Sequence, residues 1–306
     1  MTKKVTREAV FYAFDPALAP VARIRLGEEL TLETDDCFTG LVKSEKDLAP
    51  TGQNIVNPTT GPIFIEGTKS GDILRIDLLE VKIAEQAFMV TVPGSGALGD
   101  IIQKKETTIL RREGEEMVFK NRVRVQKKPM IGVIGVAPQS GSISTISPGP
   151  HGGNMDCTII GEGASLYLTV GVEGALFGAG DLHSAMGDGE IVVCGAETAG
   201  EVRFKAELAD LPGLPTPFLE NEEIVATIFS APTIDAAAKG AIHRMADFLT
   251  KLAGLPLNDA GMLMSLTGSV KICQVVDPEM TVRFEFPKRV LADYGYRLPG
   301  KNRPGG

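Results

Sequence analysis

The stretch Ser147-Pro-Gly-Pro-His-Gly-Gly-Asn-Met-Asp156, followed after an apolar run by Gly174-Ala-Leu-Phe-Gly-Ala-Gly-Asp-Leu-His-Ser-Ala-Met-Gly-Asp-Gly-Glu190, dominates this sequence. Two of the three histidines in the chain, His151 and His183, lie here among glycines and carboxylates. A neutral imidazole beside carboxylates can bind a divalent metal or transfer a proton. One Asp-x-His match alone is more often a surface turn, but the density of small and ionisable residues favours a functional site.

Strand patterns surround this segment. Apolar and charged residues alternate from Glu201 to Leu208 and again from Leu74 to Leu78, which is typical of strands with one buried face. The run Met130–Ala137 is apolar throughout, with glycines where another backbone can approach closely. The 35 glycines and 19 prolines imply many turns and therefore many short strands. We expect a mainly β protein, with a β-rich core at residues 1–210 that carries most of the site.

The composition changes near residue 210, where the connector Leu211-Pro-Gly-Leu-Pro-Thr-Pro217 begins. Beyond it, Thr233 can cap a helix with an apolar stripe that runs to Leu252, and Asn258 can cap a second, shorter helix. Strand-like runs precede and follow these helices. The sequence therefore predicts an α+β portion at residues 211–306, packed on the β-rich core.

Composition excludes several classes of function. The formal net charge of the 306 residues is −8 and no basic block appears, so nucleic acid is not an expected partner. No stretch approaches the ~20 apolar residues of a membrane helix, and no apolar segment of the signal-peptide kind follows the first lysines. Four scattered cysteines without a Cys-x-x-Cys pair are typical of reduced thiols in a cytoplasmic protein.

Several side chains of the central segment suit metal or acid–base chemistry. Asp181 and His183 are two residues apart, so on an extended backbone both leave the same side and can bind one ion. Asp188 and Glu190 repeat that spacing. Glu197 follows an apolar run, where burial would raise its pKa towards a useful acid–base value; a salt-bridged strand acid is an equal alternative.

The glycines around His151 suggest a further role for this turn. In the sequence, His151 lies between Gly-Pro and Gly-Gly, a setting that can hold its imidazole ring at the mouth of a cleft. The backbone N–H groups of Gly152 and Gly153, together with Asn154, are candidates for stabilising an oxyanion.

The two quoted motifs together resemble the acetamidase/formamidase family of short-chain amide hydrolases. The segments Thr34-Asp-Asp36, Asn57-Pro-Thr-Thr-Gly-Pro62 and Gly71-Asp72 fit the same pattern, so the resemblance extends from about Val21 to Val290. It implies a β-sandwich-like core with an α+β portion, a divalent metal, a homo-oligomer (dimer or larger), and hydrolysis of small amides such as formamide and acetamide to carboxylate and ammonia. Met186, where a glutamine is expected, and Thr169-Val-Gly171, in place of a proline-containing strand, depart from the pattern and leave the substrate open.

Carried over by position, the resemblance points to seven site residues: Asp36, His151, Asp181, His183, Asp188, Glu190 and Glu197. Of these, we assign metal ligation to Asp36, His151, Asp181 and His183, and catalysis to Glu197, Glu190 and Asp188. We assign substrate binding to Asn57, Gly152, Gly153 and Asn154. Our hypothesis is that a metal, with zinc favoured over calcium or another divalent ion, lowers the pKa of a bound water to about 7. Glu197 then carries the proton of that water to the leaving nitrogen.

Two other classes of function are compatible with the same residues. Cys157 or Ser184 could act as the nucleophile of a metal-independent amidase, although no Gly-x-Ser-x-Gly elbow is present. The chain could also be a non-catalytic, metal-containing β-rich protein that binds a small ligand. Larger amides and ureas are further possible substrates.

Overall fold

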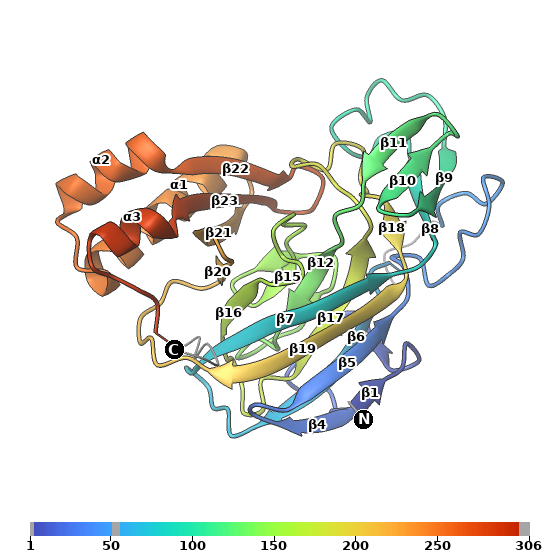
Figure 1. Cartoon of the computed structure of the whole chain (residues 1–306). Helices are drawn as coiled ribbons and strands as arrows, with labels where there is room; N and C mark the ends of the chain where they lie inside the picture. Colours follow the sequence, from blue (N-terminus) through green and yellow to red (C-terminus); the bar gives the residue numbers. More distant parts are fainter. Residues whose placement is uncertain (1–2, 51–55, 300–306) are drawn as a thin grey trace.

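A computed structural model describes residues 3–50 and 56–299, and two large sheets dominate it (Figure 1). Within these residues, one sheet has nine strands in the order β1-β5-β19-β7-β16-β20-β21-β23-β22. All neighbours in it are antiparallel except β1 and β5. Its strands are β1 Lys3–Val5, β5 Glu29–Thr34, β7 Ile73–Ile83, β16 Ser165–Thr169, β19 Gly200–Leu208, β20 Phe218–Glu220, β21 Ile224–Ala231, β22 Ser269–Gln274 and β23 Met280–Pro287.

The second sheet carries the motif segment. It runs in the order β11-β10-β9-β8-β18-β17-β12-β15-β14, and β6 joins it beside β17 and connects β2 and β4. A small third sheet pairs β3 with β13. The strands are β2 Val10–Phe11, β3 Ala13–Phe14, β4 Ala22–Arg25, β6 Thr59–Glu66, β8 Gln86–Thr91, β9 Glu106–Glu113, β10 Glu116–Phe119, β11 Val123–Gln126, β12 Met130–Gly135, β13 Ile143–Ser144, β14 Pro148–Gly149, β15 Gly152–Asn154, β17 Phe177–His183 and β18 Glu197–Thr198.

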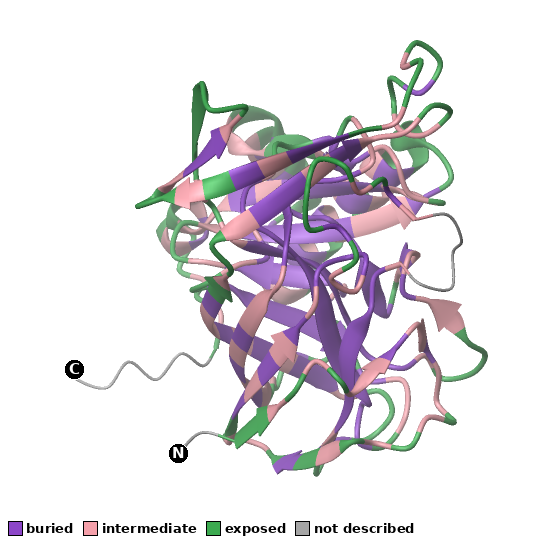
Figure 2. Ribbon diagram, turned by 90° about the vertical axis from the view of Figure 1, so that its right-hand side faces the viewer, coloured by how far each residue is buried: buried purple, intermediate pink, exposed green. Residues whose placement is uncertain are grey.

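The two large sheets pack face to face around one core. Apolar side chains of β5, β7, β16 and β19 meet those of β6, β12 and β17, and the rings of Phe177 and Phe204 lie 4.7 Å apart across the interface. The predicted alternation in β19 is confirmed, because Val202, Phe204 and Ala206 are buried while the residues between them are partly exposed. Figure 2 shows the buried strands concentrated in this layer. The predicted β-rich, sandwich-like fold is confirmed.

The C-terminal residues combine strands and helices, as predicted. Helix α1 spans Ile234–Asp247 and continues as the short π-helix η2, Phe248–Leu252; α2 spans Leu257–Thr267 and α3 spans Lys288–Asp293. Thr233 caps α1, since its side chain accepts a hydrogen bond from the Ala236 N–H at 3.3 Å. The predicted cap of α2 was wrong: that helix already begins at Leu257, directly after Pro256.

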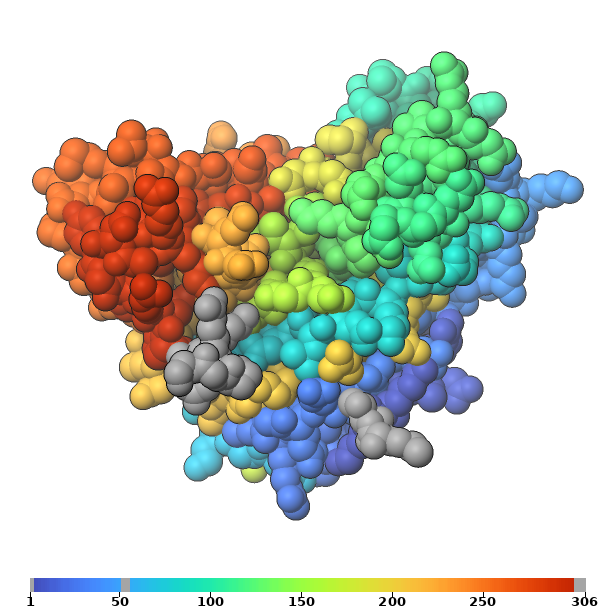
Figure 3. Space-filling view, viewed as in Figure 1, coloured from blue at the N-terminus to red at the C-terminus, as the bar shows by residue number. Residues whose placement is uncertain are grey.

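Strands β20 to β23 of the C-terminal residues continue the nine-stranded sheet, although most of their apolar side chains pack in a second core with α1 and α2. The division at residues 210 and 211 therefore stays a prediction. Figure 3 shows this C-terminal part and the β9–β11 meander projecting on opposite sides of the same face. Within the described ranges, no helix is both long and apolar enough to cross a membrane.

Candidate active site and metal-binding groups

Four carboxylates and one imidazole converge beside the core, and each residue is at most 6% exposed: Asp156, Asp181, His183, Glu190 and Glu197. His183 is central. Its Nε2 lies 3.0 Å from Glu197 Oε1, 3.6 Å from Asp181 Oδ1 and 3.9 Å from Asp156 Oδ1. These residues come from β17, β18, the segment after β15 and the loop between β17 and β18. The structure thus brings together four of the residues singled out in the sequence and adds Asp156.

Strand pairing and two glycines create this arrangement. His183 and Glu197 are direct cross-strand neighbours in the β17–β18 pair. Gly132, on the adjacent strand β12, leaves room for the acids, because a Cβ there would lie 2.5 Å from Asp156 Oδ1 and 2.6 Å from Asp181 Oδ2. Gly195 leaves room for the imidazole, because a Cβ added at this position would lie 2.6 Å from His183 Nδ1.

Three of the acids have an unusual backbone conformation. The φ angles of Asp156, Asp181 and Glu190 are 43°, 57° and 45°, in the left-handed region that L-residues rarely adopt. Such residues cost about 1–3 kcal/mol each and cluster at functional sites. Their occurrence at three carboxylates of one cluster indicates that the fold sustains this strain to aim the side chains.

Burial and mutual repulsion perturb the ionisation of these groups. Burial, followed by the charge of Asp181, raises the pKa of Asp156 to about 7. Burial also raises the pKa of Glu197 to about 8, although His183 opposes this shift. The pKa of Glu190 lies well above its usual range, again mainly because of burial. Burial alone would lower the pKa of His183. The negative charges of Glu197 and Asp181 outweigh burial, so the pKa of His183 lies well above its usual value.

The cluster contains two sets of potential metal ligands. Cys37, Asp181 and Glu197 form one set, and Asp156, His183 and Glu190 form the other; within each set the ligand atoms lie within 4.8 Å of one another.

Many of these atoms are buried without a hydrogen-bond partner, namely Asp156 Oδ1, Asp181 Oδ1, both ring nitrogens of His183, Glu190 Oε2 and Glu197 Oε2. Buried polar atoms are nearly always satisfied in proteins, so the orphaned atoms fit a bound cation. A metal would displace the proton from His183, because a ligating imidazole is neutral.

Two asparagines and a further acid support the cluster. The Asn57 amide donates to Asp181 Oδ2 at 3.2 Å, and the Asn154 amide donates to Asp277 Oδ2 at 2.9 Å. Asp277 lies in the turn between β22 and β23 and is half-buried. Its pKa lies well above the usual range because of burial and the charges of Asp156 and Asp181. Sequence reasoning missed Asp277, which no motif singles out.

The strand β22 is also joined to the loop that carries Glu190. The Gly189 N–H donates to the Cys273 carbonyl at 2.9 Å, and the Val275 N–H donates to the Gly189 carbonyl at 3.2 Å. The C-terminal part thereby holds this loop against the cluster.

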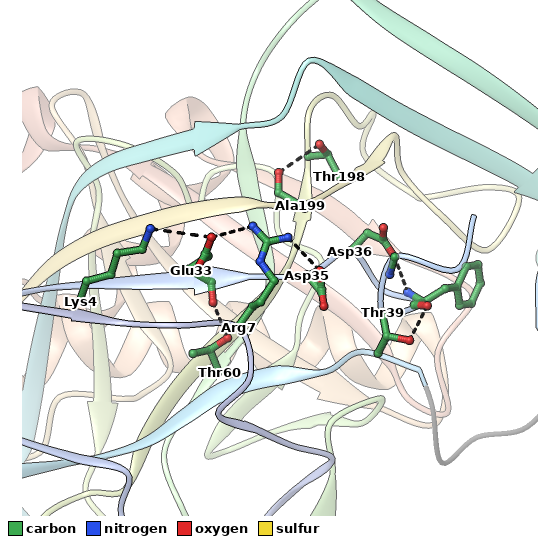
Figure 4. Close-up of polar contacts among 11 residues, drawn as sticks. Lys4, Arg7, Glu33, Asp35, Asp36, Thr39, Thr60, Thr198 and Ala199 are labelled. Carbon is green, nitrogen blue, oxygen red and sulfur yellow. Dashed lines mark hydrogen bonds and ion pairs between the residues drawn. The ribbon is translucent and has the colours of Figure 1, made fainter. Parts of the chain in front are cut away.

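Asp36, a predicted metal ligand, is buried close to the cluster but belongs to neither ligand set. Its Oδ1 accepts the N–H groups of Phe38 at 2.9 Å and Gly40 at 3.0 Å, so it orders its own turn. The neighbouring Asp35 faces the other way and pairs with Arg7 at 3.0 Å (Figure 4). Cys37, one residue further on, supplies the potential ligand instead.

His151, the other predicted histidine ligand, also lies outside both ligand sets. Its ring contacts Phe14 edge-on, with centroids 5.1 Å apart, and neither ring nitrogen has a partner. Burial lowers the pKa of His151 to about 4, so the ring is neutral at pH 7. Gly152 and Gly153 lie on β15, which pairs with β12 on one side and β14 on the other. Sheet pairing thus engages this strand on both edges, and its role in oxyanion binding stays a prediction.

Asp188 belongs to neither ligand set. Arg283 donates to both of its oxygens, at 2.7 and 2.8 Å, and Thr158 donates to Oδ1 at 2.7 Å. This bidentate pair connects the Glu190 loop to β23, which is a structural function. The predicted catalytic function of Asp188 is not tested by this contact.

The two alternative nucleophiles are both buried. The Ser184 hydroxyl donates to the Ala196 carbonyl at 3.2 Å. Cys157 lies in the apolar core between the large sheets, together with Cys273. Within the described residues, neither side chain is hydrogen-bonded to a histidine or carboxylate that would activate it.

A cleft of about 880 Å³ borders the cluster on one side. It lies between the β9–β11 meander and the segment 185–196, and most of its lining is apolar, including Phe119, Val125 and Met186. Glu190 lines the cleft and also belongs to a ligand set, so it connects the two.

Comparison with known proteins gives the family. The model of the acetamidase/formamidase family matches residues 1–143 and 139–292, almost the whole chain. The chain belongs to this family. It is accordingly an amide hydrolase, and the resemblance seen in the motifs is confirmed.

Individual acetamidase/formamidase relatives agree. A formamidase of Methylophilus methylotrophus is 25% identical over 293 residues, which cover 73% of this chain and 72% of that protein. The crystal structure of an acetamidase from Bacillus halodurans is 39% identical with a TM-score of 0.93, covering 96% of this chain and 100% of the other. A predicted acetamidase/formamidase from Thermoanaerobacter tengcongensis is 41% identical, also with a TM-score of 0.93, covering 97% and 99%.

Proposed function

We propose that this protein is a metal-dependent hydrolase that cleaves small aliphatic amides, formamide and acetamide among them, to the carboxylate and ammonia. The observation that carries metal dependence is the buried cluster of carboxylates around His183, whose free ligand atoms face one another. The amide class is supported by the similar formamidase and acetamidase.

The donor set favours zinc. Thiolate, imidazole and carboxylate are all zinc ligands, whereas calcium takes six to eight oxygen ligands. Cys37, Asp181 and Glu197, with Asp156, His183 and Glu190, would hold the metal. A bound zinc supplies a Lewis acid that polarises a carbonyl and lowers the pKa of a water to about 7.

The chain's own residues orient the ligands and move the proton. The Asn57 amide fixes the carboxylate of Asp181 by its hydrogen bond. We assign proton transfer to Asp277 instead of the predicted Glu197. Both Glu197 and Asp277 are next to the cluster, but Glu197 is 2% exposed and belongs to a ligand set. Asp277 lies outside both sets, and its raised pKa favours the protonated form that a general acid needs.

The test is an ammonia-release assay over short amides before and after treatment with a chelator. We expect turnover that the chelator abolishes and zinc restores. An enzyme that uses Cys157 or Ser184 would retain activity in the chelator, and a ligand-binding protein would release no ammonia at all. Asp277→Asn should keep its metal and lose at least about 100-fold in kcat, the lower range for a general acid–base group. Unchanged kcat in Asp277→Asn would contradict the assigned proton transfer.

A further inference from the structure

The cleft between the β9–β11 meander and residues 185–196 is much larger than formamide or acetamide. Its volume is about 880 Å³. Pockets of about 300–1,000 Å³ hold drug-sized ligands, whereas acetamide has only one methyl group to bury. The cleft therefore has room for a substrate with a far longer acyl group.

Both sides of the cleft present apolar side chains. Leu110, Phe119 and Val125 line it from the meander, and Met186 and Ile191 line it from the other side. Val125 and Ile191 are 40% and 47% exposed, so a good part of this apolar surface is in contact with water. Covering such surface is favourable in proportion to its area. An apolar group of the substrate would therefore gain binding free energy in the cleft.

The charged side chains of the lining, apart from Glu190, do not call for a charged ligand. Lys127 and Asp188 each form an ion pair within the chain, at 2.9 and 2.7 Å, and Lys128 is exposed to solvent. Polar atoms make up little of the lining beyond these groups. The walls thus suit a neutral, apolar group.

Glu190 determines which end of a ligand would face the cluster. It lines the cleft, is 6% exposed, and its Oε2 has no hydrogen-bond partner. Gly195, also in the lining, lies directly against the ring of His183, because an added Cβ would lie 2.6 Å from Nδ1. A ligand with a polar head at Glu190 and an apolar tail on the walls therefore matches the cleft. For an amide hydrolase that polar head is the carboxamide.

We propose that this cleft binds the acyl group of the substrate, and that the chain prefers primary amides of medium-length aliphatic acids to formamide and acetamide. This inference rests on the amide hydrolysis proposed above and adds its substrate class. Full burial of one methylene group strengthens binding about fourfold. Half of that free energy, for each of the four methylenes that hexanamide adds to acetamide, gives about 15-fold.

The deciding measurement is kcat/KM for ammonia release from the straight-chain amides between formamide and hexanamide. We expect kcat/KM to rise with each methylene, to about 15 times the acetamide value for hexanamide. Turnover of the short amides with a ratio below about three would overturn the inference and leave amide hydrolysis intact. Ammonia from none of the amides would overturn both.

A charged analogue tests the apolar nature of the cleft. Adipic acid monoamide carries a carboxylate at the end of a chain as long as that of hexanamide. It should be the poorer substrate, because the walls cannot hydrate a carboxylate. A higher kcat/KM for the monoamide than for hexanamide would overturn the assignment of an apolar acyl group.

Single substitutions in the walls test the location. Val125→Asp adds a charge on the meander side, and Met186→Gln replaces a thioether by an amide of similar length. Each should lower the hexanamide-to-acetamide ratio of kcat/KM, Val125→Asp at least about fivefold and mainly through KM. Val270→Asp is the matched control, because Val270 is a comparably exposed valine on β22, 46% exposed, that does not line the cleft. It should keep the wild-type ratio.

Near-ultraviolet circular dichroism shows whether each variant is folded; if Val125→Asp is not, Met186→Gln and the wild-type profile decide. An unchanged ratio in both folded wall variants would overturn the inference. An equal loss for both amides in Val125→Asp, together with dissociation of an oligomer in sedimentation velocity, would also overturn it, because a second copy of the chain would then cover the cleft.

Discussion

Gly195→Ala should disable the site without removing any functional group. The added Cβ would lie 2.6 Å from His183 Nδ1 and 2.8 Å from Cγ. Ordinary van der Waals contact begins at 3.4 Å, so the ring or the backbone at Gly195 must shift by about 0.8 Å. Both are buried, and the ring contacts Glu197 and Asp181 on its other edge.

The expected loss follows from that displacement. A misplacement of about 1 Å at a catalytic group can cost about 100-fold, or about 2.7 kcal/mol of transition-state stabilisation. Overpacking should also lower the free energy of unfolding by about 1–3 kcal/mol. We expect kcat/KM for the best short amide to fall by about 100-fold, with a lower Tm and reduced metal affinity.

Gly187→Ala is the matched control, because its Cβ would have no neighbour within 4 Å. That variant should match the wild-type protein in kcat/KM, Tm and metal content. The reasoning is refuted if folded Gly195→Ala protein keeps kcat/KM within threefold of the wild-type value.

Three further predictions address the cluster and its surroundings. His183→Ala should lose bound metal and about a thousandfold in kcat/KM, since a metal supplies several kcal/mol of transition-state stabilisation; retained activity would disprove its assignment as a ligand. Asp188→Asn should lower the free energy of unfolding by about 2 kcal/mol through its lost pairing with buried Arg283, yet keep kcat within a few-fold; a large loss of kcat at unchanged fold would support the predicted catalytic role. Because the pKa of His151 is lowered to about 4, the unfolded chain takes up this proton first as the pH falls below 6.5. Its contribution to stability is therefore present above pH 6.5 and should drop by about 2 kcal/mol between pH 7 and 5. Denaturant titrations of wild-type protein and His151→Phe measure that drop as the difference between their pH profiles, and identical profiles would exclude it.

The sequence predicted the strands and four of the five cluster residues because both depend on local patterns, whereas the sandwich followed from the family resemblance. Alternation in β19 and the apolar run of β12 follow directly from which faces are buried. Asp181 and His183 meet because they share strand β17. Glu197 joins them as the cross-strand neighbour of His183, a register that the sequence alone does not specify.

The remaining site residues depend on contacts between distant segments. Asp277 reaches Asn154 from a hairpin turn 123 positions away, and nothing local distinguishes it from a solvated turn acid. Arg283 donates to Asp188 from 95 positions away, a contact that no local pattern predicts. The predicted ligand Asp36 lies one position away from the potential ligand in the structure, Cys37. Backbone N–H groups of the turn bind the carboxylate of Asp36, and Cys37 faces the acids instead.

The joining of β22 to the Glu190 loop affects when the enzyme can become active during synthesis. Asp277 and the strand that holds Gly189 lie within the last tenth or so of the chain. A ribosome emits the N-terminal residues first, so the sandwich can form while the catalytic pocket still lacks one wall. We therefore expect chains truncated before β22 to hydrolyse no amide.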